Sequence, residues 1–138
     1  MSIRVAVAFA LLLSVSASAA HAGDDQAVRE LPPDARAFVE EVSKSLLKVQ
    51  DPDAELSCEK AVENATYGLD TMLEVGQRNR DDGYIKGADY ADAATRLRAF
   101  RAQITLDDCQ QASGPQREFY RCMSSDYNHV AACAAQLR

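Results

Sequence analysis

Residues of the types that perform catalysis are scarce in this chain. Ser125, Asp126 and His129 are the types that form a nucleophilic triad. They lie on one short segment, whereas triad members normally converge from separate elements, and no G-x-S-x-G motif accompanies them. The 138 residues include only two histidines and contain no H-E-x-x-H, C-x-x-C-H or phosphate-binding glycine motif. We therefore expect no catalytic residues, no cofactor and no metal site.

The first 22 residues have the pattern of a secretory signal peptide. Arg4 is the only charged residue before Asp24, an apolar run over residues 5–13 follows it, and Ala20-His21-Ala22 matches an A-x-A cleavage site. The apolar run is shorter than the roughly 20 residues that cross a bilayer, so we expect no stable membrane anchor. Cleavage near Ala22 would leave 116 residues in the periplasm or outside the cell, and the loss of Arg4 changes the net charge from −6 to −7.

The four cysteines are expected to form disulfides in such an oxidising location. Four cysteines allow three pairings, and sequence alone does not select one. Helical hairpins favour Cys58–Cys109 and Cys122–Cys133, because the two members of each pair are equidistant from a predicted turn. By the chain-entropy relation, the two loops would stabilise the fold by about 4 and about 3 kcal/mol.

The elements that must position these residues are helices. Apolar residues recur at helical spacing over residues 35–49, 54–76 and 90–104, and a last segment over 119–137 is interrupted by polar residues. No strand-like alternation is present. The sequence predicts an all-α fold, a small bundle of four to five helices stapled by two disulfides. The expected organisation is a cleaved signal peptide over 1–22, a flexible N-terminal tail over 23–31 and a single helical domain over 32–138.

Caps mark some of the helix ends. Pro33 and Asp34 are typical of a first helical turn, and Asp51 is a candidate N-cap for the second helix. Thr105 with Asp108 three residues later resembles a capping box and predicts a short new turn that contains Cys109.

Acidic residues gather on one side of the second predicted helix. We call this set the acidic ridge: it comprises Glu55, Glu59, Glu63, Asp70 and Glu74. Like charges at i, i+4 repel, so the ridge does not help the helix to form. Two interpretations stay open: a solvated face that keeps the protein soluble, and a docking strip for a cationic partner.

Tyrosines are a second indication of a binding surface. Tyr67, Tyr120 and Tyr127 fall off, or at the edge of, the apolar stripes. Exposed tyrosines beside charged residues are common anchors of protein interfaces. We therefore include these three side chains with the acidic ridge as the candidate partner-binding residues.

Two stretches of the sequence resemble small exported bacterial proteins of the lysozyme-inhibitor type. They are Leu106-Asp107-Asp108-Cys109 and the run from Cys122 to Tyr127, followed by a final Leu137-Arg138. The resemblance implies a short, helical, cysteine-stapled exported protein. No individual binding residue follows from it.

Charge and composition favour a protein partner. A pI near 4.8 argues against nucleic acid, which requires clustered positive charge. We expect an exported, non-catalytic protein-binding module, such as a periplasmic inhibitor or an immunity protein acting on a secreted enzyme. The alternative is a small-ligand carrier, and an exported enzyme comes third. A carrier requires an apolar cavity between helices, with space left at Phe38, Leu46, Met72, Leu97 and Phe100.

Overall fold

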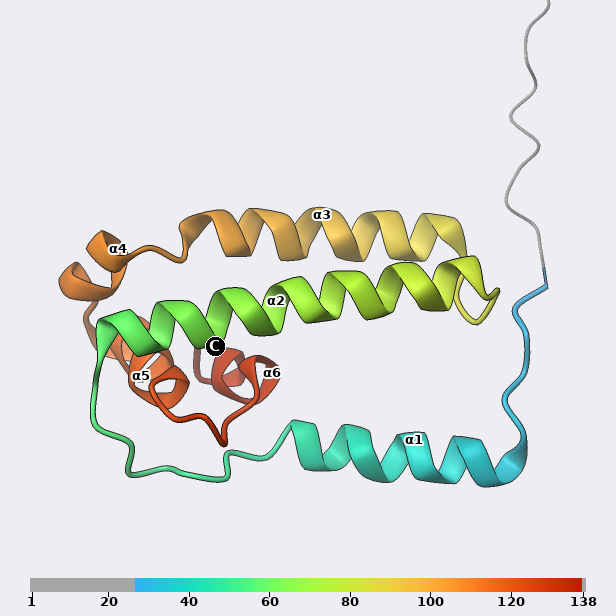
Figure 1. Cartoon of the computed structure of the whole chain (residues 1–138), viewed down its shortest axis with the longest axis horizontal. Coiled ribbons are helices and arrows are strands. Elements are labelled where there is room, and N and C mark those ends of the chain that lie inside the picture. Colours follow the sequence, from blue (N-terminus) through green and yellow to red (C-terminus); the bar gives the residue numbers. More distant parts are fainter. Residues whose placement is uncertain (1–26, 138) are drawn as a thin grey trace, which may run out of the picture.

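The computed structural model describes residues 27–137, and this part of the chain is helical without any strand (Figure 1). The predicted signal peptide therefore lies outside the described residues. The all-α prediction is confirmed, with six α-helices in place of four to five, because the short turn after Thr105 is a helix of its own and the last segment splits in two. The elements are α1 (Pro33–Leu46), α2 (Cys58–Asp81), α3 (Gly87–Gln103), α4 (Leu106–Gln111), α5 (Gly114–Met123), α6 (Val130–Ala134) and the 3-10 helix η1 (Ala135–Leu137).

Helices α2 and α3 form an antiparallel hairpin along the length of the molecule (Figure 1). The turn between them uses Gly83 at φ +81°, a conformation that residues with a side chain rarely adopt. The N-terminal segment is tied to this turn, because the backbone N–H of Arg29 donates to the carbonyl of Gly83 at 2.8 Å. The Arg29 guanidinium also lies 5.5 Å from the centre of the Tyr84 ring.

Helix α2 begins four residues later than its apolar pattern predicts. Ser57, and not Asp51, is its N-cap, and the Ser57 hydroxyl accepts the backbone N–H of Lys60. Ser57 is held in place from a distant part of the chain, since its N–H donates to Ser124 Oγ at 2.9 Å and its carbonyl accepts from the same hydroxyl at 3.1 Å. This contact across the fold fixes the start of the helix, and local sequence does not reveal it.

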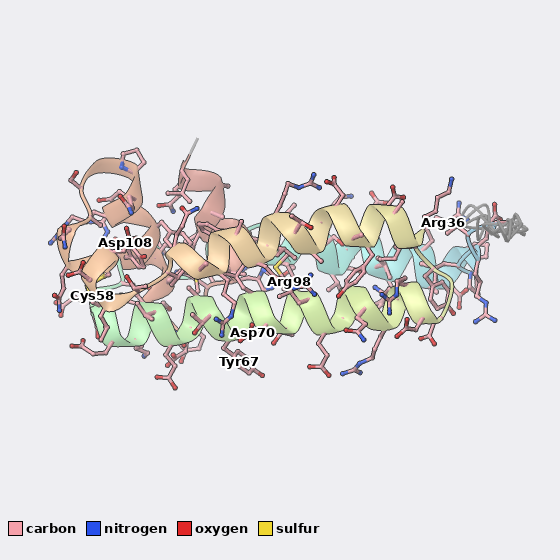
Figure 2. The ribbon with its side chains drawn as sticks, turned by 90° about the horizontal axis from the view of Figure 1, so that it is seen from above. Arg36, Cys58, Tyr67, Asp70, Arg98 and Asp108 are labelled. Atoms are coloured by element: carbon pink, nitrogen blue, oxygen red, sulfur yellow. A yellow bond between two sulfur atoms is a disulfide. The ribbon has the colours of Figure 1, made fainter. Side chains whose placement is uncertain are left out.

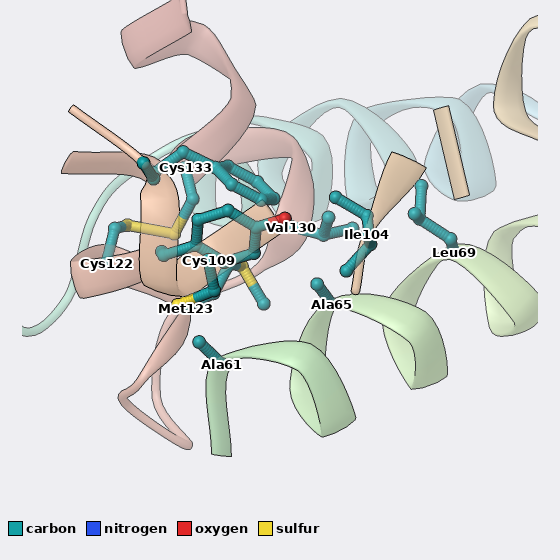
Figure 3. Close-up of a cluster of buried hydrophobic side chains, with 12 residues drawn as sticks. Ala61, Ala65, Leu69, Ile104, Cys109, Cys122, Met123, Val130 and Cys133 are labelled. Carbon is teal, nitrogen blue, oxygen red and sulfur yellow. A yellow bond between two sulfur atoms is a disulfide. The ribbon is translucent and has the colours of Figure 1, made fainter. Parts of the chain in front are cut away.

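The core lies around the first half of α2, where α4, α5 and α6 pack against it (Figure 3). Small residues on α2, Ala61 and Ala65, let these short helices approach closely, and Leu69 closes this side of the core. The second half of α2 has α3 beside it but lies beyond α5 and α6 (Figure 1). Its apolar residues, such as Met72, are therefore only partly buried.

Both predicted disulfides are confirmed. Cys58 is bonded to Cys109, with the Cα atoms 5.7 Å apart, and Cys122 to Cys133, with the Cα atoms 5.6 Å apart. The first bond joins the start of α2 to α4, and the second joins α5 to α6. Thr105 also caps α4 as expected, since its hydroxyl accepts the N–H of Asp108 at 3.1 Å.

Helix α1 stays outside the core. Its amphipathic pattern predicted a buried stripe, yet no residue of α1 is buried. The core is built from α2, α4, α5, α6 and the end of α3, so the apolar stripe of α1 is not part of it. Among the residues described, no helix is both long and apolar enough to span a membrane.

Candidate functional site

The acidic ridge is less continuous than predicted. Glu55 lies before the start of α2, in a segment without helical structure, and so it does not belong to the helix face. Glu59 and Glu63 are on α2 and exposed. Further along, Glu74 forms an ion pair with Arg78 one turn later. Within residues 27–137, Glu59 and Glu63 form no ion pair, so the ridge keeps two uncompensated acids at its beginning and is partly neutralised at its end.

Asp70 of the acidic ridge is paired with a cationic residue of another helix. It receives two hydrogen bonds from Arg101 on α3, Nε to Oδ1 at 2.5 Å and Nη2 to Oδ2 at 2.7 Å. These bonds hold the pKa of the Asp70 carboxyl below its ordinary value. Asp70 and Tyr67 lie at the same edge of α2 (Figure 2). The structure therefore uses Asp70 to join two helices, and its charge is already compensated.

The three candidate tyrosines have different environments. Tyr67 on α2 is 75% exposed and Tyr127, in the turn between α5 and α6, is 79% exposed. Tyr120 was expected at the surface, and this prediction is wrong, because Tyr120 is 0% exposed. Its ring packs edge-to-face on Phe119, with the ring centres 5.2 Å apart. Tyr67 and Tyr127 remain available for contact with a partner, and Tyr120 does not.

Tyr120 instead belongs to a polar network with half-buried Asp108 and exposed Gln116. Its hydroxyl donates to Asp108 Oδ2 at 2.5 Å, and Gln116 Nε2 lies 2.8 Å from each carboxylate oxygen of Asp108. Burial, reinforced by the hydrogen bond to Asp108, raises the pKa of Tyr120. The network connects α4 to α5 close to the Cys58–Cys109 bond.

The apolar face of α1 is the largest feature that the predicted site omitted. Phe38 is 67% and Leu47, the residue after α1, is 62% exposed. The large apolar side chains of Val39, Val42 and Leu46 on the same helix are also exposed. A helix with a clear apolar stripe normally covers that stripe with another element. Here the stripe is open to solvent.

An apolar groove lies beside this face. Its volume is about 500 Å³, and it runs between the end of α1, the second half of α2 and the start of α6. The walls are mostly apolar and carry no carboxylate. The lining residues are Ser43, Leu46, Leu47, Thr71, Met72, Val75, Gly76, Asn79, His129 and Ala131.

A second groove lies on the other side of the same stretch of α2. It has a volume of about 490 Å³ between α2, α3 and the N-terminal segment at Val28. Met72 and Gly76 line both grooves. Leu97 lines the second. Space is therefore left next to Leu46, Met72 and Leu97, three of the positions at which a small-ligand carrier would need it.

Asn128 holds the chain that follows α1 against the core. Its Oδ1 accepts the backbone N–H groups of Gln50 at 2.8 Å and of Asp51 at 2.9 Å. Its Nδ2 donates to the carbonyls of Asp51 at 2.7 Å and of Cys122 at 2.9 Å. With Arg29 bound to Gly83 on the other side, α1 is anchored beyond both of its ends, and none of its residues is buried.

Ser125, Asp126 and His129 are not connected to one another by hydrogen bonds within residues 27–137. The Ser125 hydroxyl accepts the N–H of Tyr127, and His129 Nδ1 accepts the N–H of Ala131 as the N-cap of α6. Asp126 pairs with Lys60 at 2.7 Å, which holds the pKa of its carboxyl below the ordinary value. The same part of the chain contains no group of three or more histidine, cysteine or acidic residues arranged to hold a metal ion.

Comparison with known proteins adds no relative. No family model, no curated protein and no solved structure matches this chain. The resemblance to exported proteins of the lysozyme-inhibitor type stays a prediction.

The apolar face of α1 was visible in the sequence as an amphipathic stripe. Its exposure was not, because it depends on which helices fill the core.

Proposed function

We propose that this protein is an exported, non-catalytic protein-binding module, such as a periplasmic inhibitor or an immunity protein that acts on a secreted enzyme. The observation that carries the proposal is the exposed apolar face of α1, with Phe38 67% exposed, beside an open apolar groove. Contiguous apolar surface of this kind marks interaction sites on soluble proteins. The two disulfides and the signal-peptide pattern support an exported location.

The face that we assign to the partner differs from the one expected from the sequence alone. The acidic ridge is shortened at Glu55 and compensated at Asp70 and Glu74, so it supplies little free charge to a partner. The α1 face needs no opposite charge on the partner, because burial of apolar side chains is itself favourable by about 25 cal/mol for each Å². Exposed Tyr67 and Tyr127 are on other elements and would contact a partner only at its margin.

Two neighbouring substitutions test the proposal. Phe38→Glu places a negative charge on the apolar face, whereas Ala37→Glu places the same charge on the opposite, exposed side of α1. Each mature variant, checked for unchanged helicity, is immobilised and exposed to periplasmic and extracellular extracts. We expect wild type and Ala37→Glu to retain one protein in a fixed stoichiometry and Phe38→Glu to lose it. Equal retention by Phe38→Glu would show that α1 is not the binding face.

A small-ligand carrier is the second candidate, because two grooves of about 500 and about 490 Å³ flank Met72 and Gly76. Pockets that bind small ligands have volumes of roughly 300–1,000 Å³. Native mass spectrometry of the freshly purified mature protein distinguishes this function. A carrier would show an added small mass that disappears on denaturation. The mass of the polypeptide alone would argue against it.

A further inference from the structure

A third cavity, away from α1, has a different chemical character. It has a volume of about 300 Å³ and opens between the end of α3, α4 and α5. Its walls combine rings and aliphatic side chains with one carboxylate and the side-chain amides of Gln103 and Gln116. The apolar, aromatic and acidic residues of the lining are Phe100, Ile104, Asp108, Phe119, Tyr120 and Leu137.

The carboxylate of Asp108 is half-buried and has only neutral hydrogen-bond donors around it. Gln116 Nε2 lies 2.8 Å from both oxygens and the Tyr120 hydroxyl lies 2.5 Å from Oδ2. No cationic side chain among residues 27–137 forms an ion pair with it. A carboxylate offers about four acceptor positions, so Asp108 can accept a further hydrogen bond from a ligand.

Aromatic rings form the wall next to this carboxylate. Phe100 and Phe119 are packed edge-to-face with ring centres 5.5 Å apart, and Phe119 and Tyr120 with centres 5.2 Å apart. Phe119 and Tyr120 are 1% and 0% exposed, so their rings lie behind the cavity surface, and Phe100 is the ring that a ligand can touch. An anion would be repelled by Asp108. A wholly apolar ligand would cover the carboxylate without pairing it, which is costly.

We propose that this cavity binds an alkyl chain that ends in a single positive charge, an alkylammonium or alkylguanidinium group. The charge lies against Asp108, and the alkyl chain packs along Phe100, Ile104 and Leu137. The volume admits a group of this size, since about 30 Å³ is the share of one water molecule in the liquid. The protein's net negative charge attracts such ligands from solution.

Two sources can supply this chemistry: a free amine, or a lysine or arginine side chain of a partner protein. Only the second source rests on the proposed function. Binding of small probes to the isolated mature protein tests the cavity without any partner. A failure of this test is therefore distinct from a failure of the α1 experiment.

The test titrates n-butylammonium and n-butylguanidinium chloride into the mature protein and follows backbone amide NMR signals of Asp108, Tyr120 and Leu137. Butan-1-ol and sodium butyrate are the neutral and anionic controls of the same chain length. We expect saturable shifts with the two cations and none with the controls. Asp108→Asn should weaken cation binding at least tenfold. Asp107→Asn, an equal loss of charge at the exposed neighbouring residue, should leave it unchanged.

A blocked lysine, N-acetyl-lysine N-methylamide, separates the two sources. If it binds as butylammonium does, the cavity takes a side chain of a polypeptide. If only butylammonium binds, the ligand is a free amine; either result supports the cation site. Equal shifts with butan-1-ol, or full binding by Asp108→Asn, would overturn it. Binding that occurs only in an Arg138→Gln variant would also overturn it, because the cavity would then be filled by the chain's own last side chain.

Discussion

Asp70 on α2 and Arg101 on α3 form a two-point ion pair that joins the two long helices, with Nε to Oδ1 at 2.5 Å and Nη2 to Oδ2 at 2.7 Å. The two parallel hydrogen bonds between guanidinium and carboxylate fix the orientation of the two groups in addition to the attraction of their charges. The hydrogen bond from Arg101 lowers the pKa of Asp70. The sequence places Asp70 in a possible docking strip, whereas in the structure Asp70 joins α2 to α3.

This ion pair predicts an acid-dependent loss of stability. The pKa of Asp70 is lower in the folded than in the unfolded chain, where a value of about 3.9 is expected. The contribution of the pair is therefore fully present above about pH 4 and is lost as the pH falls through the folded pKa. We expect Asp70→Asn to unfold at a lower temperature than wild type at pH 7 and the two melting temperatures to converge in acid. Glu63→Gln serves as the control. A difference that stays constant with pH would contradict this account.

Asn128 should be among the most sensitive polar residues. Its side chain makes four hydrogen bonds, to Gln50, to Asp51 twice and to Cys122. Removal of one partner of buried hydrogen bonds costs about 1–3 kcal/mol, and we expect Asn128→Ala to fall at the upper end of this range in urea unfolding. Amide hydrogen exchange at Gln50 and Asp51 should become faster. Gln110→Ala, at an exposed position of α4, should change stability by no more than about 0.5 kcal/mol. Equal effects of the two substitutions would refute the role of Asn128.

His129 predicts a separate dependence near neutral pH. Burial lowers its pKa, and Nδ1 must be unprotonated to accept the N–H of Ala131. The folded pKa is below the unfolded value of about 6.5, so stability is complete above about pH 6.5 and declines as the pH falls further. His129→Asn preserves a capping acceptor but does not titrate. Its melting temperature should vary less than that of wild type between about pH 7 and pH 5. Parallel curves for the two proteins would exclude His129 as the cause.

The two disulfides should contribute unequally. Cys58–Cys109 closes 51 residues and Cys122–Cys133 closes 11. Chain entropy predicts losses of about 4 and about 3 kcal/mol when each pair is replaced by alanine. Urea unfolding of the two double variants, each with the other bond intact, measures the difference. A larger loss from the shorter loop would indicate that packing, and not chain entropy, dominates.

Much of the architecture was predictable from local signals. The disulfide pairing followed from the position of each cysteine relative to a turn, which the helical hairpins of the fold preserve. The cap at Thr105 followed from side-chain chemistry within four residues. Such features depend on neighbours in the sequence or on simple symmetry about a turn, and these are readable before the fold is known.

The features that were not predictable depend on contacts between distant segments. Tyr120 looks like an edge residue on a helical stripe, but it is buried in the core that α2, α4, α5 and α6 form together. Gly68 on α2 leaves space for Val130 of α6, whose Cγ1 lies 3.0 Å from the position of an added Cβ, and the sequence does not reveal this contact. The stripe of α1 is apolar in sequence whether or not another helix covers it. For this reason the candidate binding face is α1 in the structure and the acidic ridge in the sequence.

We propose that a partner protein covers the apolar face of α1, and hydrogen–deuterium exchange measures this cover at individual amides. The experiment compares exchange of the α1 amides, residues 36–46, in the mature protein alone and in complex with the protein that it captures. We predict slower exchange along α1 in the complex by at least tenfold, with little change at Tyr67 on α2. Unchanged exchange in α1, with protection appearing around Tyr67 and Glu63, would contradict the claim and return the binding site to the acidic ridge.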